Sequence, residues 1–263
     1  MKSSFGKKSV YKALILDVDG TIMPNKRNAM PSQKVTDAIA KASNILHVCL
    51  ATSRPYKAVA HIFDHLGLSY YSIVNGGAQI FDMKTRKVVW EKQIEQTDVV
   101  AICDILQNTI RVPFWLNDGS KDTFIPPGNI PKKVFQMYIT AKLTNTVADD
   151  YIHKISHIAN IAANKVPSWD EGYYDILISH ALATKQHGIF EIAKLLGVQT
   201  HAIIGVGDGY NDFPLLMACG LKVAMGNSVP ELKAIADYIA PSVADDGVVD
   251  IINKFILYKN IIL

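Results

Sequence analysis

Continuous apolar runs alternate with amphipathic stretches in the first third of the chain. Residues 13–16, 45–51 and 71–74 show no alternation of apolar and polar side chains, which is typical of strands buried on both faces of a parallel sheet. Between them, Pro31-Ser32 opens a stretch with apolar residues at helical spacing, and residues 55–67 carry the start and stop signals of a second helix. This order of strands and helices predicts a doubly wound α/β unit.

The pattern changes over residues 82–179. Predicted strands become shorter there, and turn signals such as Asn117-Asp118-Gly119 and Asp170-Glu171-Gly172 are frequent. Amphipathic helical stretches lie near residues 98–108 and 147–161. These features predict an inserted α+β segment with its own partly antiparallel sheet.

The first pattern returns after the insert. Residues 185–196 form a helical stretch closed by Gly197, and residues 201–206 and 221–224 are buried strands. The apolar C-terminal stretch, residues 248–263, is interrupted by charged residues and predicts a packing helix with a possible final strand. We therefore expect a doubly wound, mostly parallel Rossmann-like α/β core at residues 1–81 and 183–263, with an α+β cap inserted at residues 82–182.

The composition excludes several classes of protein. The chain has 263 residues, of which 49% are hydrophobic and 19% charged, enough apolar material for a packed core and too much for global disorder. Its net charge is +3, and its Lys and Arg residues are scattered. A phosphate-neutralising surface for nucleic acid is therefore not expected.

The cysteines and the apolar segments indicate the compartment. Cys49, Cys103 and Cys219 lie far apart, each in an apolar stretch, so we expect buried thiols in a reducing environment, with no disulfide scaffold or zinc site. The apolar run near the N-terminus is too short for a signal peptide, and no run reaches the roughly 18 apolar residues of a membrane span. We expect a soluble, cytoplasmic protein without a membrane partner.

Polar residues follow four of the predicted core strands. They are Asp17 and Asp19, then Thr52-Ser53-Arg54, Asn75-Gly76-Gly77, and finally Asp208 with Asn211 and Asp212. Ligands of open α/β sheets bind outside the carboxyl ends of the strands. Carboxylates that converge there repel one another unless a cation joins them, and oxygen ligands favour Mg²⁺. A hydroxyl, an amide and a lysine nearby suit an anion such as phosphate.

Each of these features also has a structural explanation. Thr52 precedes a predicted helix and would ordinarily cap it, a lone lysine such as Lys185 is usually a solvated helix residue, and Asn75-Gly76-Gly77 is by default a tight turn. The matching loops after two buried strands favour phosphoryl transfer. One carboxylate can attack phosphorus, and a second, two residues further on, can protonate the leaving oxygen and later take a proton from water.

The chain resembles haloacid dehalogenase-superfamily phosphatases of the Cof type, which carry a large α+β cap after the third core strand. The resemblance covers both core segments, while the cap matches mainly by position and size. It rests on Leu16-Asp17-Val18-Asp19-Gly20-Thr21, Ala51-Thr52-Ser53-Arg54-Pro55, Asn75-Gly76-Gly77, Lys185, Gly207-Asp208-Gly209-Tyr210-Asn211-Asp212, Val223-Ala224-Met225-Gly226-Asn227, Ala236-Asp237 and Asp246-Gly247-Val248.

The resemblance implies roles for individual residues. Asp17 would be the nucleophile and Asp19 the general acid and base, and Mg²⁺ would be held by Asp17, the backbone carbonyl of Asp19, and Asp208. The phosphate and substrate would be bound by Thr52, Ser53, Lys185 and Asn211, with Asp212, Arg54, Asn75 and Gly76 in support. Two departures lie close to the site and could narrow it or add a substrate contact: Ser53 stands where the family usually has Gly, and Gln186-His187-Gly188 follows Lys185 where the family has Gly directly.

The resemblance implies a Mg²⁺-dependent phosphatase that acts through an aspartyl-phosphate on a small phosphorylated metabolite, such as a sugar phosphate or a nucleotide-derived monophosphate. We expect a monomer or weak homo-oligomer. The cap would close over the site, and its residues 169–174 could reach the leaving group. The alternatives are a phosphomutase on the same core, a phospho-acceptor signalling module and a catalytically silent binding protein. The acid/base position at Asp19 and the large insert argue against the signalling module.

Overall fold

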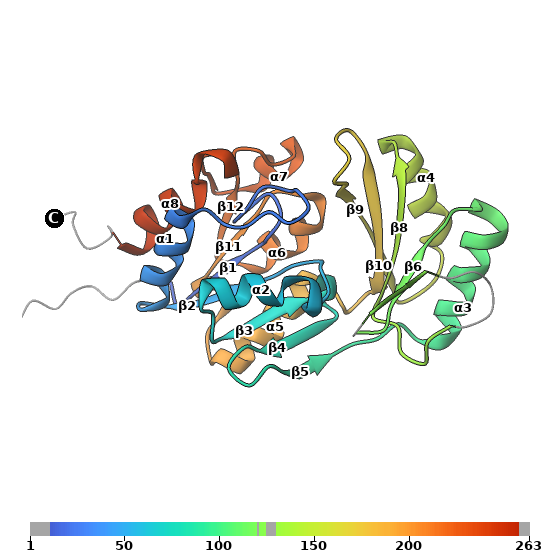
Figure 1. Ribbon diagram of the computed structural model, residues 1–263, viewed down its shortest axis with the longest axis horizontal. Coiled ribbons are helices and arrows are strands. Elements are labelled where there is room, and N and C mark those ends of the chain that lie inside the picture. Colours follow the sequence, from blue (N-terminus) through green and yellow to red (C-terminus); the bar gives the residue numbers. More distant parts are fainter. Residues whose placement is uncertain (1–10, 120, 125–129, 258–263) are drawn as a thin grey trace, which may run out of the picture.

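The computed structural model describes residues 11–119, 121–124 and 130–257 of the chain. A core and a cap lie side by side along the long axis of the molecule (Figure 1). The core is built on a parallel sheet in the order β13-β12-β11-β1-β2. Its strands are β1 (Ala13–Leu16), β2 (His47–Leu50), β11 (Ile203–Gly207), β12 (Leu221–Ala224) and β13 (Tyr238–Ile239).

β1 can lie inside this sheet, between β11 and β2, because its side chains are apolar on both faces. Leu14 and Leu16 join one apolar layer and the other two residues join the layer on the opposite face, and all four are fully buried. In the parallel register, Leu16 lies opposite Val206 of β11 and Leu50 of β2. The carboxyl ends of these three strands therefore meet at one edge of the sheet.

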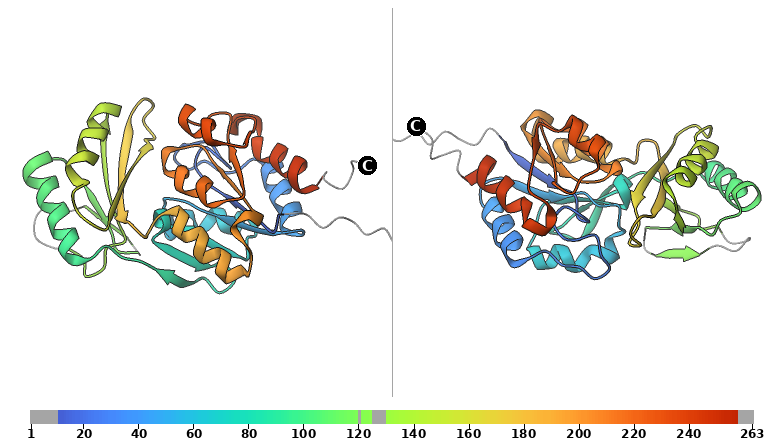
Figure 2. Two further views of the ribbon diagram at one scale, coloured as in Figure 1. Left: turned by 180° about the vertical axis from the view of Figure 1, so that it is seen from behind. Right: turned by 90° about the horizontal axis from the view of Figure 1, so that it is seen from above.

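Helices cover both faces of the parallel sheet (Figure 2). One layer contains α1 (Gln33–Ser43), α2 (Tyr56–Leu66), α8 (Gly247–Ile252) and its π-helical continuation η6 (Asn253–Leu257), and the other contains α5 (Lys185–Leu196), α6 (Phe213–Ala218) and α7 (Pro230–Ile235). Ser32 caps α1 by accepting the N–H of Val35 at 3.2 Å. Gly67 and Gly197 end α2 and α5 in left-handed conformation, as the sequence predicted.

A small antiparallel sheet continues the core beyond β2. Its strands are β3 (Tyr71–Val74), β4 (Gln79–Asp82) and β5 (Lys87–Glu91). A parallel bridge between Ala51 and Ile73 connects it to the end of β2. β5 lies within the range expected for the insert, but it pairs with β4, and Trp90 packs on the apolar layer of the core. We therefore propose that the cap begins after β5 and not at residue 82.

The cap is an antiparallel sheet in the order β7-β6-β8-β10-β9, with helices on one face. Its elements are α3 (Gln96–Asp104), η2 (Ile105–Ile110), β6 (Trp115–Asn117), β7 (Asp122–Phe124), β8 (Gln136–Leu143), α4 (Asn145–Ile155), β9 (Ile161–Pro167) and β10 (Tyr174–His180). The helices and one sheet face share an apolar cluster, and the other face is turned towards the core (Figure 1). The expected fold class, a parallel α/β core with an α+β cap, is confirmed.

The second helix of the cap, α4, is shorter than predicted. Residues 147–161 were expected to be helical, but α4 ends at Ile155 and the chain turns before β9. Asn160 has a φ of 62°, a left-handed conformation that Asn tolerates and that a helix cannot continue through. The possible final strand falls at residues 258–263, which lie outside the described residues. Among the described helices, none is long and apolar enough to cross a membrane.

Candidate active site

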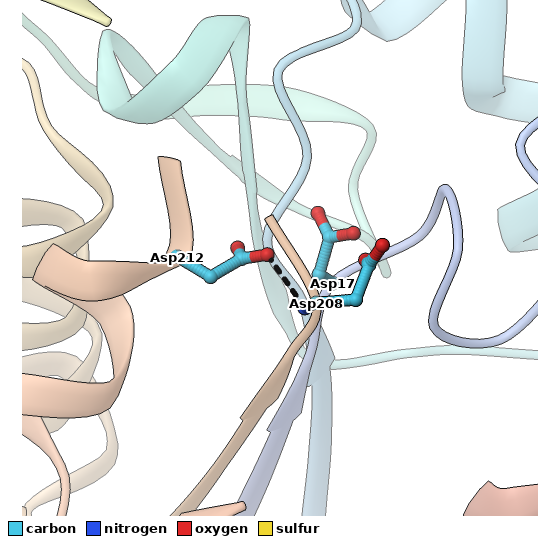
Figure 3. Close-up of side chains that lie close together, drawn as sticks. All are labelled: Asp17, Asp208 and Asp212. Carbon is cyan, nitrogen blue, oxygen red and sulfur yellow. Dashed lines mark hydrogen bonds between the residues drawn. The ribbon is translucent and has the colours of Figure 1, made fainter. Parts of the chain in front are cut away.

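Acidic side chains come together at the carboxyl ends of β1 and β11. Asp17 directly follows β1 and Asp208 directly follows β11, and the parallel pairing of the two strands brings these residues side by side. Asp212 reaches them from η4 (Tyr210–Asp212). One carboxylate oxygen from each of the three residues lies within 4.8 Å of those of the other two (Figure 3). The sequence predicted the first two as metal ligands and the third as a supporting residue.

Asp212 also holds the loop that carries Asp208. One of its oxygens accepts the backbone N–H of Asp208 at 2.9 Å and that of Gly209 at 3.0 Å, and the first of these bonds is the dashed line in Figure 3. Without this carboxylate, both N–H groups would lack a hydrogen-bond acceptor in a buried turn. The fully buried Asp212 provides a charged acceptor for the two. The loop after β11 is therefore fixed by a residue of the site itself.

Lys185 is the first residue of α5, whose start is capped by Thr184. Its Nζ donates to Oδ1 of Asp17 at 2.5 Å and to Oδ1 of Asp212 at 2.6 Å. The Lys185 side chain is only 1% exposed, so it is not a solvated helix residue. It places one positive charge between two of the three clustered carboxylates.

The Asn75–Gly77 turn supports Lys185 from outside the site. Gly77 has a φ of +119°, and a Cβ there would lie 2.2 Å from the carbonyl carbon of Thr184, so the turn can pack on the start of α5 only with glycine at this position. Gly76 is also left-handed, with a φ of 67°, and the buried Asn75 donates to Gln79 at 2.8 Å. Asn75 and Gly76 thus shape the turn, and Gly77 is the residue that packs on the start of α5.

The electrostatics of the cluster favour a bound cation. Burial raises the pKa of Asp17 to about 8, and Asp212 raises it as well, while Lys185 opposes both. Burial and Asp17 hold the pKa of Asp208 well above its usual range. Burial lowers the pKa of Lys185, but the two carboxylates outweigh it and the net shift is upward. Three carboxylates around one ammonium leave an excess of negative charge, and this set of oxygen donors fits Mg²⁺.

The Asp19 side chain points to a different partner. Its two oxygens accept hydrogen bonds from Nε of Arg54, at 2.7 Å, and from Nη2 of Arg54. Both side chains are mostly buried, with 22% and 15% exposed. A bidentate pair of this kind fixes the plane of the carboxylate.

A cavity of about 800 Å³ lies between the carboxylate cluster and the cap sheet. Six of the predicted site residues line it: Asp17, Asp19, Ser53, Arg54, Asp208 and Asn211. Lys185 contacts Asp17 from the buried side, and Asp212 contacts Lys185. Within the described part of the chain, Thr52, Asn75 and Gly76 do not line the cavity.

In the segment after β2, Thr52 takes part in a local turn and Ser53 lines the cavity. Thr52 is buried and its hydroxyl accepts the backbone N–H of Arg54 at 3.1 Å. It does not cap the next helix, because α2 begins after Pro55 without a side-chain cap. Ser53, one of the two departures from the family pattern, accepts a hydrogen bond from Asn211 at 3.0 Å across the cavity floor. The other departure lies at the start of α5, where the His187 ring contacts the Thr184 hydroxyl at 2.9 Å.

Two core residues of the site received no role from the sequence. Thr21 donates to Oδ1 of Asp208 at 3.1 Å, and Asn227 donates to the carbonyl of Gly20 at 2.8 Å. Gly20 itself has a φ of +81°, and a Cβ there would meet the Asp208 carboxylate at 2.2 Å. Thr21 and Asn227 lie in motifs that carry the family resemblance. The sequence therefore places them near the site, but it does not predict their contacts.

The cap supplies a further set of cavity residues that the sequence did not single out. On the core-facing side of the sheet they include Trp115, Asp122, Gln136, Tyr138, Thr140, Lys142, Asp175 and Leu177. Burial raises the pKa of Asp175 to about 6. Oδ1 of Asp175 and Oε1 of Gln136 are buried and have no hydrogen-bond partner among the described residues. Two acceptors are thus available to the donors of a bound molecule.

A parallel α/β core with an acidic, cation-binding centre at its strand ends, facing a cavity under an inserted cap, defines a capped hydrolase of the α/β class. The family model of haloacid dehalogenase-like hydrolases matches residues 14–166 and 117–252. The chain belongs to this family, and the expected resemblance is confirmed.

The chain is also similar to curated phosphatases over most of its length. It is 25% identical to 5-amino-6-(5-phospho-D-ribitylamino)uracil phosphatase YcsE of Bacillus subtilis, over 94% of this chain and 96% of that protein. It is 24% identical to phosphoglycolate phosphatase 1 of Saccharolobus solfataricus, with the same coverage of 94% and 96%. A solved haloacid dehalogenase-like hydrolase from B. subtilis has the same fold, with a TM-score of 0.81 at 19% identity over 93% of this chain and 100% of that one. The chain is a phosphatase of the haloacid dehalogenase-like family.

Proposed function

We propose that the chain is a Mg²⁺-dependent phosphatase that hydrolyses small phosphomonoesters through an aspartyl-phosphate on Asp17. The observation that carries the proposal is the position of the Asp17 carboxylate. It lines the cavity, accepts a hydrogen bond from Lys185 on its buried side, and lies beside Asp208. A nucleophilic carboxylate, a counter-charge and an acidic metal centre are the groups that this chemistry requires.

The metal ligands would be Asp17, the backbone carbonyl of Asp19, and Asp208, with Asp212 behind them. Mg²⁺ bound there would neutralise charge and orient the phosphoryl group. Asp17 must be ionised to attack phosphorus, and burial opposes this by raising its pKa to about 8. Lys185, in direct contact, favours the ionised form.

The two carboxylates after β1 divide the reaction between them. An oxygen of Asp17 attacks phosphorus as the bond to the leaving oxygen breaks, and the carboxylic acid of Asp19 gives its proton to that oxygen. Asp19, now a carboxylate, then takes a proton from water while the water oxygen attacks phosphorus. This second step frees Asp17 and releases inorganic phosphate. Ser53 and Asn211, hydrogen-bonded to each other in the cavity wall, would bind the phosphoryl oxygens.

The cavity accommodates a substrate of metabolite size. Its volume of about 800 Å³ suits a sugar phosphate or a nucleotide-derived monophosphate. The unpartnered acceptors of Gln136 and Asp175 would receive hydroxyl or amine donors of the leaving group. The buried free thiols of the three cysteines fit a cytoplasmic location, because they require no oxidising compartment.

Phosphate release from a panel of phosphomonoesters tests the proposal. The wild type and Asp17→Asn are assayed in parallel, with Mg²⁺ and with a chelator. We expect turnover that needs the metal and is lost in the variant, which keeps its fold by circular dichroism. Isomerised sugar phosphate in place of free phosphate would identify a phosphomutase, and folded, Mg²⁺-loaded protein without turnover on any ester would refute a hydrolase.

A further inference from the structure

Three adjacent strands of the cap sheet, β6, β8 and β10, place apolar side chains in one row. Tyr138 of β8 lies opposite Trp115 of β6 and opposite Leu177 of β10. Residues directly opposite each other in an antiparallel pair share a face of the sheet, and all three side chains line the catalytic cavity. Because neighbouring strands are about 4.8 Å apart, this apolar row is about 10 Å wide. The cap therefore presents a broad apolar surface to a molecule in the cavity.

Contacts within the cap fix the two rings of the apolar row. The Trp115 ring meets that of Phe124 edge to face, with 5.1 Å between the centroids. The Tyr138 hydroxyl hydrogen-bonds the Asp122 carboxylate, which also accepts the side-chain amide of Asn117 at 2.6 Å. Rings held in this way lose little freedom when a ligand packs on them. The apolar row is thus preorganised for a planar group.

Two unpartnered acceptors flank the apolar row. Oε1 of Gln136 and Oδ1 of Asp175 are buried and have no hydrogen-bond partner among the described residues, and both residues line the cavity. Gln136 precedes Tyr138 by two positions on β8, and Asp175 precedes Leu177 by two positions on β10. Because these strands are antiparallel, the two acceptors lie on opposite sides of the row. Donors at the edges of a ring on the row would satisfy them.

Asp175 has no counter-charge from the protein. Lys142, a cation of the same cap face, pairs with Asp170 at 3.3 Å. Within the part of the chain that the structure describes, Asp175 forms no ion pair, and its hydrogen-bond partner is the neutral Ser168. Burial raises the pKa of Asp175 to about 6, so its carboxylate is mainly charged at neutral pH. A partly buried carboxylate of this kind favours a ligand that brings a positive charge.

We propose that the leaving group of the substrate is a planar aromatic or heteroaromatic ring that carries an amino group, with the ring stacked on Trp115 and Tyr138 and the amino group bound by Asp175. The inference rests on the proposed function, in which the phosphate of the same molecule lies at Asp17. The two rings of the cap then select the shape of the substrate, and Asp175 selects its charge. Gln136 accepts a further donor at the opposite edge of the ring.

A pair of esters with the same kind of leaving oxygen tests the stacking. Benzyl phosphate and cyclohexylmethyl phosphate both release a primary alkoxide, but only the first carries a planar ring. We expect the wild-type kcat/KM to be about 5-fold higher or more on benzyl phosphate, and this ratio to fall below about 2-fold in Tyr138→Leu. Tyr138→Phe keeps the ring and should keep the preference. The ratio does not depend on the fraction of protein that is folded.

Tyr151→Leu is the matched control for the stacking. Tyr151 is also a half-buried tyrosine of the cap, but it lies on α4 and packs on the apolar cluster at the other face of the sheet. Its removal perturbs the packing of the cap without altering the apolar row, so the ratio should stay within about 1.5-fold of the wild-type value. A wild type without the preference, or a preference that survives in Tyr138→Leu, would overturn the stacking.

Benzyl phosphates with an aminomethyl group at the ortho, meta or para position test the role of Asp175. At least one isomer should exceed benzyl phosphate about 10-fold in kcat/KM, because hydrogen bonds between charged groups are the stronger ones. Asp175→Asn keeps the shape of the side chain and removes its charge, so the gain should fall below about 3-fold. Asp150→Asn is the control: Asp150 lies on α4, is 51% exposed and pairs with Lys154, and the gain should be unchanged.

The outcomes separate this inference from the proposed function. No gain from any isomer, a gain that survives in Asp175→Asn, or glucose 6-phosphate as a better substrate than every ring ester would overturn the inference. The proposed function would stand in each case, since phosphate is still released and its release still requires Asp17. A wild type without turnover on any ester, or turnover that survives Asp17→Asn, would overturn the proposed function.

Discussion

Lys185 compensates the charge of two buried carboxylates, those of Asp17 and Asp212, at 2.5 and 2.6 Å. Lys185→Met would leave both carboxylates buried without this counter-charge. Breaking a buried ion pair from one side generally costs about 3–5 kcal/mol. We expect a loss of this size in the free energy of unfolding of the metal-free protein, measured by urea denaturation at neutral pH.

Lys194 of the same helix provides the control for this substitution. Its side chain is 71% exposed and pairs with Glu191 at 2.7 Å. Because exposed pairs contribute little, Lys194→Met should change the free energy of unfolding by no more than about 0.5 kcal/mol. Similar small effects at both positions would contradict the structural role of Lys185.

Asp175 gives the protein a pH dependence of stability. Burial raises the pKa of this carboxyl from 3.8 to about 6, so between these values the folded state holds a proton that the unfolded chain has released. Stability from this group therefore falls as the pH rises from about 4 to about 6. The substitution Asp175→Asn removes this titration. The free energy of unfolding of the variant, relative to that of the wild type, should therefore be about 1–2 kcal/mol higher at neutral pH than at pH 4, after allowance for partial exposure.

Urea denaturation of the wild type and Asp175→Asn at a series of pH values measures this difference, since the titration of the other groups cancels between the two proteins. Asp150→Asn is the control, because Asp150 is 51% exposed and pairs with Lys154 at 2.6 Å on α4. Since exposed pairs contribute little, this substitution should change the free energy of unfolding by no more than about 0.5 kcal/mol. A curve for Asp175→Asn that runs parallel to that of the wild type would show that this carboxyl titrates normally.

At the scale of elements, the packing of η1 (Asn75–Gly77) on α5 fixes the position of Lys185. In Gly77→Ala the new methyl group would overlap the carbonyl carbon of Thr184. The alanine would also have to adopt a φ of +119°, which is strained for any residue with a Cβ. The start of α5 must then move, so we expect a loss of more than about 2 kcal/mol in the free energy of unfolding. We also expect a drop in phosphatase activity, because Lys185 moves with the helix.

Gly197→Ala separates the strain from the steric overlap. Gly197 ends the same helix with a φ of +66°, but nothing lies within 4 Å of a Cβ at this position. The substitution carries only the cost of the left-handed conformation, about 1 kcal/mol, and should leave the activity unchanged. Equal effects of the two substitutions would show that the turn does not position α5.

The core elements were predictable because burial on both faces leaves a continuous apolar signal. β1 and β11 are buried at every position, and the runs in the sequence coincide with them. The strands of the cap are different: all positions of β9 are half-buried or exposed, and β5 is almost wholly exposed. Neither pattern distinguishes a strand from a loop, so the pattern predicts the type of the insert but does not define its first residue.

The same distinction holds for the site. Asp17 and Asp208 were predictable because the carboxyl ends of parallel strands converge, and this depends only on local pattern and topology. The pairing of Asp19 with Arg54 and the contact of Trp169 with Arg54 depend on how separate segments pack in three dimensions. Asp175 lies in a strand whose cavity-facing side is set by the position of the whole cap.

At the scale of the molecule, the cap has an apolar cluster separate from those of the core, and the clustered carboxylates all belong to the core. Mg²⁺ should therefore stabilise the core directly and the cap hardly at all. At a metal concentration 100 times its Kd, the expected gain for the core is about 2.7 kcal/mol. Variants that keep only Trp90 or only Trp115 report on core and cap separately, because Trp90 packs on the core layer and Trp115 lies in β6.

Fluorescence-detected urea denaturation of these variants, with Mg²⁺ and with a chelator, should thus show a shift for Trp90 and little for Trp115. Asp208→Asn in the Trp90 variant is the control. It removes one of three mutually repelling carboxylates. Burial and the two neighbouring carboxylates keep the pKa of Asp208 raised, so the metal-free core should become more stable while the response to Mg²⁺ disappears. Equal shifts for both tryptophans would mean that core and cap unfold as one unit, and an undiminished response in Asp208→Asn would place the metal elsewhere.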